Sequence, residues 1–140
     1  MGGQQHPEEA TQALRQAIEI DANHFFAHIE LSRILIDAEY FAEAETALVE
    51  ALHIQPKNPQ LLLALGDCQL RLNRYARADT TFTKALATQV VDPVAIARIY
   101  YQRQQPDRAI QYYERALIRA PDDPMILNNL AWTYAEEGLH

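Results

Sequence analysis

The sequence predicts an all-α protein, a right-handed α-solenoid in which antiparallel helical hairpins stack on one another. Three observations support this fold class. Pairs of alanines seven residues apart recur along the chain, an apolar stripe with helical spacing surrounds each pair, and prolines separate the stripes. We therefore expect a single repeat array over residues 7–138, preceded at residues 1–6 by a disordered leader or a cloning remnant.

The alanine pairs define the second helix of each hairpin, which we call helix B. Each pair brackets one large side chain and is followed by an aliphatic one, so the apolar residues share a helical face. The pairs are Ala10 and Ala17, Ala44 and Ala51, Ala78 and Ala85, and Ala109 and Ala116, with successive steps of 34, 34 and 31 residues. The bracketed side chains are Leu14, Leu48, Phe82 and Tyr113.

The first helix of each hairpin, helix A, carries an aliphatic residue followed by a small one. These positions are Leu31 and Ser32, Leu65 and Gly66, Ile96 and Ala97, and Leu130 and Ala131. Small residues at matched points on both helices allow two backbones to approach closely, while the neighbouring large side chains fill the space around the crossing. The pattern therefore predicts tightly crossed hairpins.

Turn and proline signals set the expected boundaries. Links within hairpins are expected near residues 39–40, 73–74 and 104–106, and prolines mark the segments between hairpins. We expect an unpaired helix B at residues 7–24, repeats at 25–58, 59–89 and 90–123, and an unpaired helix A at 124–138. The two unpaired helices predict a segment of a longer array, because natural arrays usually end in a polar capping helix.

One junction is three residues short. Ala51 and Leu65 are 14 residues apart, whereas the equivalent Ala85 and Ile96 are 11 apart. Asp92 followed by Pro93 is typical of an N-cap and a first helical residue, so helix A of the third repeat is expected to start late.

Together these features resemble the tetratricopeptide repeat. The clearest unit runs from Pro59 to Asp92, and the resemblance covers about residues 7–138. Its matching positions are Leu65, Gly66, Tyr75, Ala78, Phe82 and Ala85. The resemblance implies a non-catalytic scaffold that binds a peptide or a partner helix in a concave groove lined by the A helices. The segment NNLAWTYAEEG is similar in style to bacterial repeats, so we expect a fragment of a longer, bacterial-type protein.

The expected groove residues lie on one stripe of each helix A, at spacing i, i+4 and i+7. They are Ile29, Arg33, Ile36, Leu63, Asp67, Leu70, Val94, Arg98, Tyr101, Asn128 and Trp132. Such a surface suits an amphipathic helix or an apolar extended segment that bears a charge. The alternative is that the apolar members pack between neighbouring A helices, and that Asp67 simply pairs with Arg33 and Arg98.

A second function remains open at this point, namely self-association. The unpaired terminal helices carry apolar residues whose covering helices are absent, and the two helices are complementary halves of one hairpin. These residues are Leu14, Ile18, Leu127, Leu130 and Tyr134. A head-to-tail contact between chains could complete that hairpin and give a homo-oligomer.

Charge and hydropathy exclude other classes. The net charge of −7 argues against nucleic acid as a partner, because phosphate binding needs clustered Lys and Arg. No stretch approaches the roughly 20 apolar residues of a spanning helix, so no transmembrane segment is expected. Composition does not choose between a cytoplasmic and an envelope-associated parent protein. Arg71, Arg74 and Arg77 cluster at one turn, as solvated residues or as contacts for an acidic partner.

No catalytic, metal or cofactor site is expected. His24 and His28 are four residues apart, but no third ligand lies at a motif distance, which favours surface histidines at a helix start. Cys68 is expected to be a small core thiol. Ser32 occupies the small position of its helix A and should be buried, which excludes it as a nucleophile.

Overall fold

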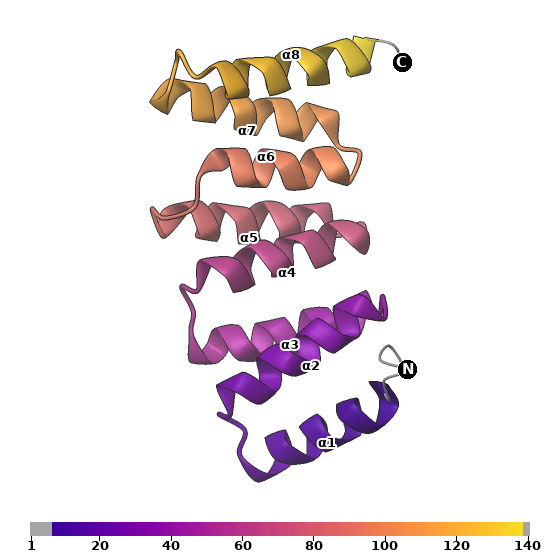
Figure 1. Cartoon of the computed structure of the whole chain (residues 1–140). Coiled ribbons are helices and arrows are strands. Elements are labelled where there is room, and N and C mark those ends of the chain that lie inside the picture. Colours follow the sequence, from indigo (N-terminus) through magenta and orange to yellow (C-terminus); the bar gives the residue numbers. More distant parts are fainter. Residues whose placement is uncertain (1–6, 139–140) are drawn as a thin grey trace.

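The computed structural model describes residues 7–138, which form eight α-helices and contain no strand (Figure 1). The helices are α1 (Pro7–Ile20), α2 (Phe25–Asp37), α3 (Phe41–Ile54), α4 (Pro59–Arg71), α5 (Tyr75–Ala87), α6 (Pro93–Gln102), α7 (Pro106–Arg119) and α8 (Pro124–Gly138). The predicted leader at residues 1–6 lies outside the described residues. Along the rest of the chain the helices follow one another from one end of a stack to the other.

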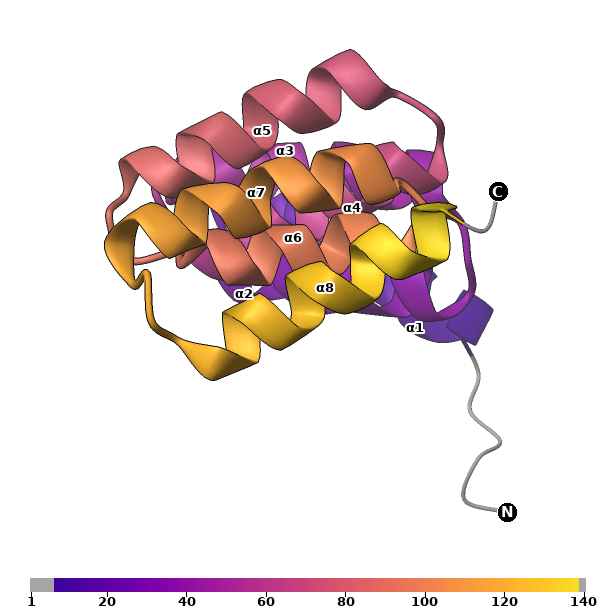
Figure 2. The ribbon, with the colours of Figure 1, turned by 90° about the horizontal axis from the view of Figure 1, so that it is seen from above.

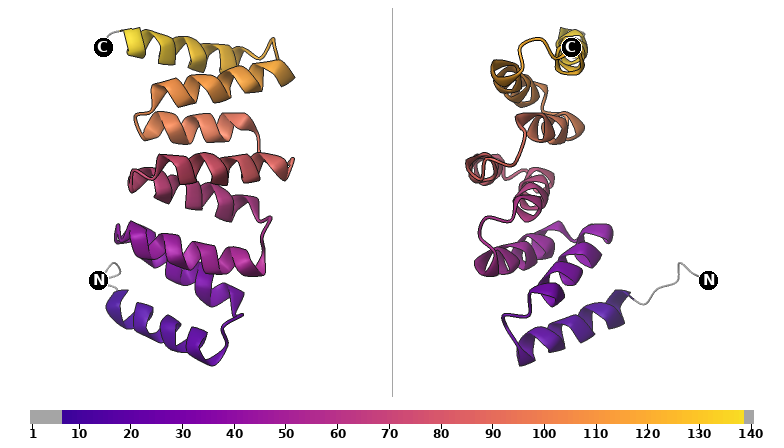
Figure 3. Two further views of the ribbon diagram at one scale, coloured as in Figure 1. Left: turned by 180° about the vertical axis from the view of Figure 1, so that it is seen from behind. Right: turned by 60° about the vertical axis from the view of Figure 1, so that its left-hand side comes forward.

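The helices form two layers (Figure 3). The A helices α2, α4, α6 and α8 lie on one side of the stack, and the B helices α1, α3, α5 and α7 lie on the other. The most extensive packing joins α2 to α3, α4 to α5, and α6 to α7. Viewed along the stack, the array is one hairpin wide (Figure 2). The predicted all-α helical-repeat solenoid is confirmed, whereas the division into repeats at residues 25–58, 59–89 and 90–123 stays a prediction.

The links within hairpins lie where the sequence predicts them. Each contains one residue with a positive φ, namely Glu39 (64°), Asn73 (59°) and Gln104 (61°). In each case the next backbone amide bonds back to a carbonyl near the helix end, as in Arg74 N to Gln69 O at 2.7 Å. This closure satisfies carbonyl groups that would otherwise lack a partner at the end of helix A.

The shortened junction also behaves as predicted. Asp92 is the N-cap of α6, its carboxylate accepts a hydrogen bond from Val94 N at 2.9 Å, and Pro93 is the first helical residue. Helix α6 has 10 residues, whereas α2 and α4 have 13 each. The missing residues therefore come from the first turn of this helix A.

Aromatic rings fill the space around that junction. Tyr100 on α6 meets Phe82 on α5 edge to face, with ring centroids 5.2 Å apart, and stacks on Tyr112 of α7 at 5.4 Å. Phe82 and Tyr100 are almost fully buried. Because α5 and α6 make few close backbone approaches, we attribute their cohesion to these large side chains.

Size matching at the hairpin crossing is tightest in the second hairpin. A Cβ atom built on Gly66 of α4 would lie 2.4 Å from Cε1 of Phe82 on α5, and that ring is fully buried. The 34-residue period places Ser32 and Leu48 at the equivalent positions of the first hairpin. Compared with the second hairpin, the first therefore has a larger residue on helix A, Ser32 for Gly66, and a smaller one on helix B, Leu48 for Phe82.

We predict that Gly66→Ser lowers the free energy of unfolding by about 1–3 kcal/mol, because the added atoms overlap the immobile Phe82 ring. Chemical denaturation of the full chain measures this change. The double variant Gly66→Ser, Phe82→Leu reproduces the Ser32 and Leu48 combination and should regain part of the loss. Equal stability of Gly66→Ser and the parent chain would contradict the size-matching account.

Candidate functional site

The exposed face of the A-helix layer is the candidate binding surface, and most of the predicted groove residues reach it. Arg33, Arg98, Asn128 and Trp132 are exposed, and Ile29, Ile36, Leu63, Asp67 and Tyr101 are half-buried. These side chains come from all four A helices, so the surface runs along the whole stack.

Leu70 and Val94 differ from the prediction. Only 3% of Leu70 and 6% of Val94 is exposed, and both belong to the core cluster that contains Phe82 and Tyr100. Helix α4 approaches α6 directly as well as its hairpin partner, so these two side chains are enclosed. For this pair of residues the alternative of packing in the interior is the correct one.

The alternative in which Asp67 pairs with Arg33 and Arg98 is wrong. Asp67 instead accepts a hydrogen bond from Arg103 Nε at 2.7 Å and lies 3.6 Å from Arg71 Nε. Arg33 pairs within its own helix, with Glu30 at 2.8 Å and Asp37 at 3.5 Å. The Asp67 carboxylate therefore ties α4 to the end of α6 and is not a free charge in the middle of the surface.

Arg98 keeps its charge available. It is exposed, and its guanidinium lies 3.9 Å from Met125 Sδ of α8. No carboxylate within the described residues forms an ion pair with it. An acidic group of a partner could approach this guanidinium.

Tyr101 lies one helical turn after Arg98 on α6 and is hydrogen-bonded to Trp132 of α8. Trp132 of α8 has 61% of its surface exposed, and its Nε1 donates a hydrogen bond to the hydroxyl of Tyr101 on α6 at 2.9 Å. The Tyr101 hydroxyl donates in turn to Glu136, and this bond to a carboxylate raises the pKa of Tyr101. The indole is thus held in one orientation while its face remains open to solvent.

A hollow of about 740 Å³ adjoins this aromatic pair at the end of α6 and α8. Its walls include Tyr101, Pro106, Glu136 and Glu137. A hydrogen bond with Asp107 raises the pKa of Glu137, because two carboxylates close together favour retention of a proton. This end of the surface is acidic, whereas the end at Arg98 is basic.

The histidines and Ser32 have structural roles. His24 is the N-cap of α2 and its Nδ1 accepts a hydrogen bond from Ala27 N at 3.2 Å. His28 lies 2.8 Å from the carbonyl of Ala22 through Nε2 and is buried, so its predicted surface position is wrong. Ser32 is buried as predicted and donates to Ile29 O. Over residues 7–138, no three His, Cys, Asp or Glu side chains are grouped to hold a metal ion.

Cys68 is a core thiol, as the sequence predicts. Only 2% of its surface is exposed, and burial raises its pKa to about 11. The raised pKa disfavours the thiolate, which is the nucleophilic form.

We predict that Cys68 reacts very slowly with a thiol reagent in the native protein at pH 8. With a pKa near 11, only about one thiol in a thousand is ionised at that pH, and the sulfur is also shielded. Absorbance with a chromogenic disulfide reagent measures the rate, and the same chain in denaturant provides the control. Rapid labelling of the native protein would contradict the assignment.

The sequence interpretation missed the polar contacts that bridge consecutive hairpins. Glu45 of α3 is buried and accepts hydrogen bonds from Gln69 of α4 at 3.0 Å, from Arg77 of α5 at 3.3 Å, and from Arg74. Arg74 and Arg77 are therefore bound within the chain instead of being purely solvated.

The next pair of hairpins repeats this arrangement. Asp79 of α5 accepts hydrogen bonds from the Tyr100 hydroxyl of α6 and from Arg108 of α7. Glu45 and Asp79 each follow the first alanine of a helix B and are 34 residues apart. That recurrence of a carboxylate is the sequence signal that could have revealed the contact.

Comparison with known proteins agrees with this architecture. Two family models, each described as a tetratricopeptide repeat, match residues 35–100 and 94–140. A curated relative, the beta-barrel assembly-enhancing protease of Yersinia pestis, is 32% identical over 108 residues, which is 75% of this chain and 22% of that protein. The chain therefore spans less than a quarter of that relative.

Solved structures show the same fold. A crystal structure of MamA protein superimposes with a TM-score of 0.70 at 18% identity and covers 95% of this chain and 74% of its own. YrrB, described as a TPR protein with an unusual peptide-binding site, superimposes with a TM-score of 0.59 at 20% identity, covering 92% of this chain and 68% of its own.

The chain belongs to the tetratricopeptide repeat family. Repeats of this family form protein–protein interaction scaffolds that are generally non-catalytic, and this chain has that architecture. None of the helices within residues 7–138 is long and apolar enough to cross a membrane.

Proposed function

We propose that this chain binds a partner polypeptide, as an extended segment or an amphipathic helix, on the exposed face of its A helices. The observation that carries the proposal is the open indole of Trp132, fixed in orientation by the hydroxyl of Tyr101. Aromatic side chains with one polar atom bound and one face open are suited to anchoring a partner, because they offer a large contact area at low entropic cost.

The charges beside this anchor restrict the partner. Arg98 lies near the middle of α6, and Glu136 and Glu137 lie at the end of α8. A segment that places an apolar side chain against Trp132 and an acidic side chain near Arg98 satisfies both features. Half-buried Ile29, Ile36 and Leu63 extend the apolar surface toward the other end of the stack.

We also propose that this chain is not catalytic. The relative named as a protease is matched over only 22% of its length, so its activity is not carried over. Ser32 and Cys68, the serine and the cysteine of the chain, are both buried. In addition, the Ser32 hydroxyl donates a hydrogen bond to the backbone carbonyl of Ile29.

Self-association through the terminal helices has less support than the sequence predicts. Leu130 is already buried, and Leu14 and Ile18 pack against the core cluster of the first hairpin. Leu127 and Tyr134 remain 45% and 47% exposed. Of the five side chains that the sequence offers to a second copy, only these two are therefore exposed.

We predict that Tyr101→Ala, Trp132→Ala weakens capture of a partner at least about tenfold without changing the helical circular dichroism, because the anchor is lost while the fully buried side chains of the core stay in place. Affinity capture followed by titration of the captured protein measures the effect. Ile118→Ala is the matched control, since Ile118 is 81% exposed on α7 in the other layer. Equal binding by the double variant and the parent chain would overturn the proposal.

A further inference from the structure

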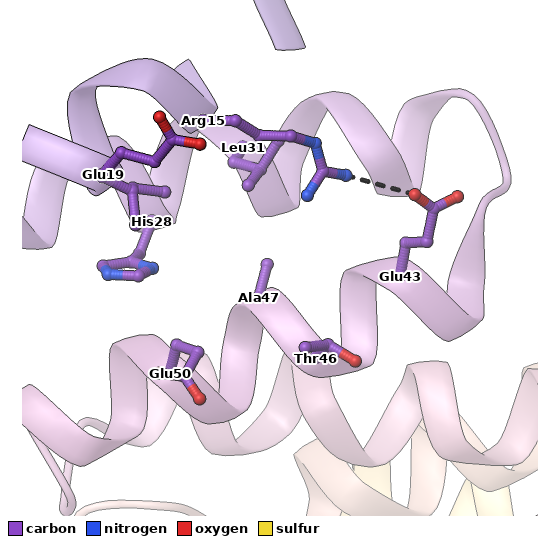
Figure 4. Close-up of a pocket in the computed structure, with 9 residues that line it drawn as sticks. Arg15, Glu19, His28, Leu31, Glu43, Thr46, Ala47 and Glu50 are labelled. Atoms are coloured by element: carbon purple, nitrogen blue, oxygen red, sulfur yellow. Dashed lines mark hydrogen bonds and ion pairs between the residues drawn. The ribbon is translucent and has the colours of Figure 1, made fainter. Parts of the chain in front are cut away.

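A second hollow lies in the other layer, between α1 and α3, with α2 behind it. It has a volume of about 400 Å³ and is distinct from the A-helix face. Figure 4 shows its labelled side chains pointing into a common space, with an ion pair from Arg15 of α1 to Glu43 of α3 at one side. Its apolar surface comes from Ile18, Leu31 and Ala47.

One position of the repeat that lines the hollow is small here. Ala47 corresponds to Thr81 in the second hairpin and to Tyr112 in the third, since each lies three residues after the first alanine of its helix B. The Tyr112 ring is buried and stacks on Tyr100. At the first junction a methyl group takes the place of that ring, and α1 has no buried residue that compensates.

The rim of the hollow is acidic. Glu19, Glu43 and Glu50 line it and are exposed, and Arg15, its only arginine or lysine, already pairs with Glu43 at 3.1 Å. His53 lies 3.9 Å from Glu50, and Nε2 of His28 is taken by the Ala22 carbonyl.

The equivalent positions one repeat later are basic. Arg77 corresponds to Glu43, and Lys84 corresponds to Glu50. The acidic rim therefore distinguishes the first junction from the second, and it adds to the excess of 11 acidic over 3 basic residues in positions 1–70.

We propose that the hollow between α1 and α3 is a docking site for a partner segment that inserts an aromatic side chain flanked by arginine or lysine. The aromatic ring would take the place that Tyr112 takes in the third hairpin, and the flanking cations would meet Glu19 and Glu50 at the rim. The site is separate from the A-helix face, so its occupancy does not depend on the proposed function of that face.

The probe is the synthetic peptide acetyl-Arg-Tyr-Arg-amide, titrated into the full chain and followed by NMR shifts of the Ala47 and Leu31 methyl groups. Binding is expected with the parent chain. It is expected to weaken at least about tenfold with Ala47→Tyr, which fills the hollow from within. Acetyl-Glu-Tyr-Glu-amide and acetyl-Arg-Ala-Arg-amide are the matched probes, and both should bind at least about tenfold more weakly.

Two further variants separate peptide binding at the hollow from loss of folding and from binding at the A-helix face. Glu19→Gln, Glu50→Gln changes only exposed side chains and should weaken binding of the basic peptide about threefold or more at low salt. Tyr101→Ala, Trp132→Ala should leave it unchanged. The proposal is overturned by an absence of shifts at Ala47 and Leu31, by equal binding of the acidic peptide, or by unchanged affinity in the glutamine variant. Methyl shifts that depend on protein concentration without peptide would also overturn it, because they would identify a second copy of this chain as the occupant.

Discussion

The structure depends on a constraint of size at the place where the two helices of a hairpin cross. In the second hairpin Gly66 faces the buried ring of Phe82 so closely that no Cβ atom fits. Close crossing fixes each hairpin as a rigid unit, and successive units then stack with one layer of A helices and one of B helices. The candidate site lies on the exposed A-helix face, where half-buried Ile29, Leu63 and Tyr101 also pack against the core.

Stacking of one hairpin on the next uses a different interaction. Glu45 and Asp79 are placed at the same position of the repeat, and each receives an arginine from the following helix B. Glu45 is buried and Asp79 is half-buried, and a carboxylate removed from water is costly without partners, so this arrangement favours one alignment of neighbouring hairpins. At the shortened junction the rings of Tyr100 and Tyr112 stack on each other, whereas at the first junction Ala47 lines a hollow.

The fold was predictable because it follows from local, repeated signals: alanine spacing, small residues on helix A, and the Asp92 and Pro93 start of α6. The polar contacts of the site could not be predicted from the sequence, because they depend on how far side chains reach from one helix to another. Asp67 meets Arg103 at the end of α6, 36 residues along the chain. Leu70 and Val94 were misassigned because the direct approach of α4 to α6, which no helical period encodes, buries them.

The central functional claim is that a partner contacts the A-helix layer. The most direct measurement is photo-crosslinking with a benzophenone amino acid placed at Asn128, which leaves Trp132 in place, or, in a second protein, at Ile118, followed by identification of the crosslinked products. The account predicts a specific partner crosslink from position 128, which is exposed on the A-helix layer, and none from position 118, which is exposed on the other layer. A crosslink that forms from position 118 alone would contradict it.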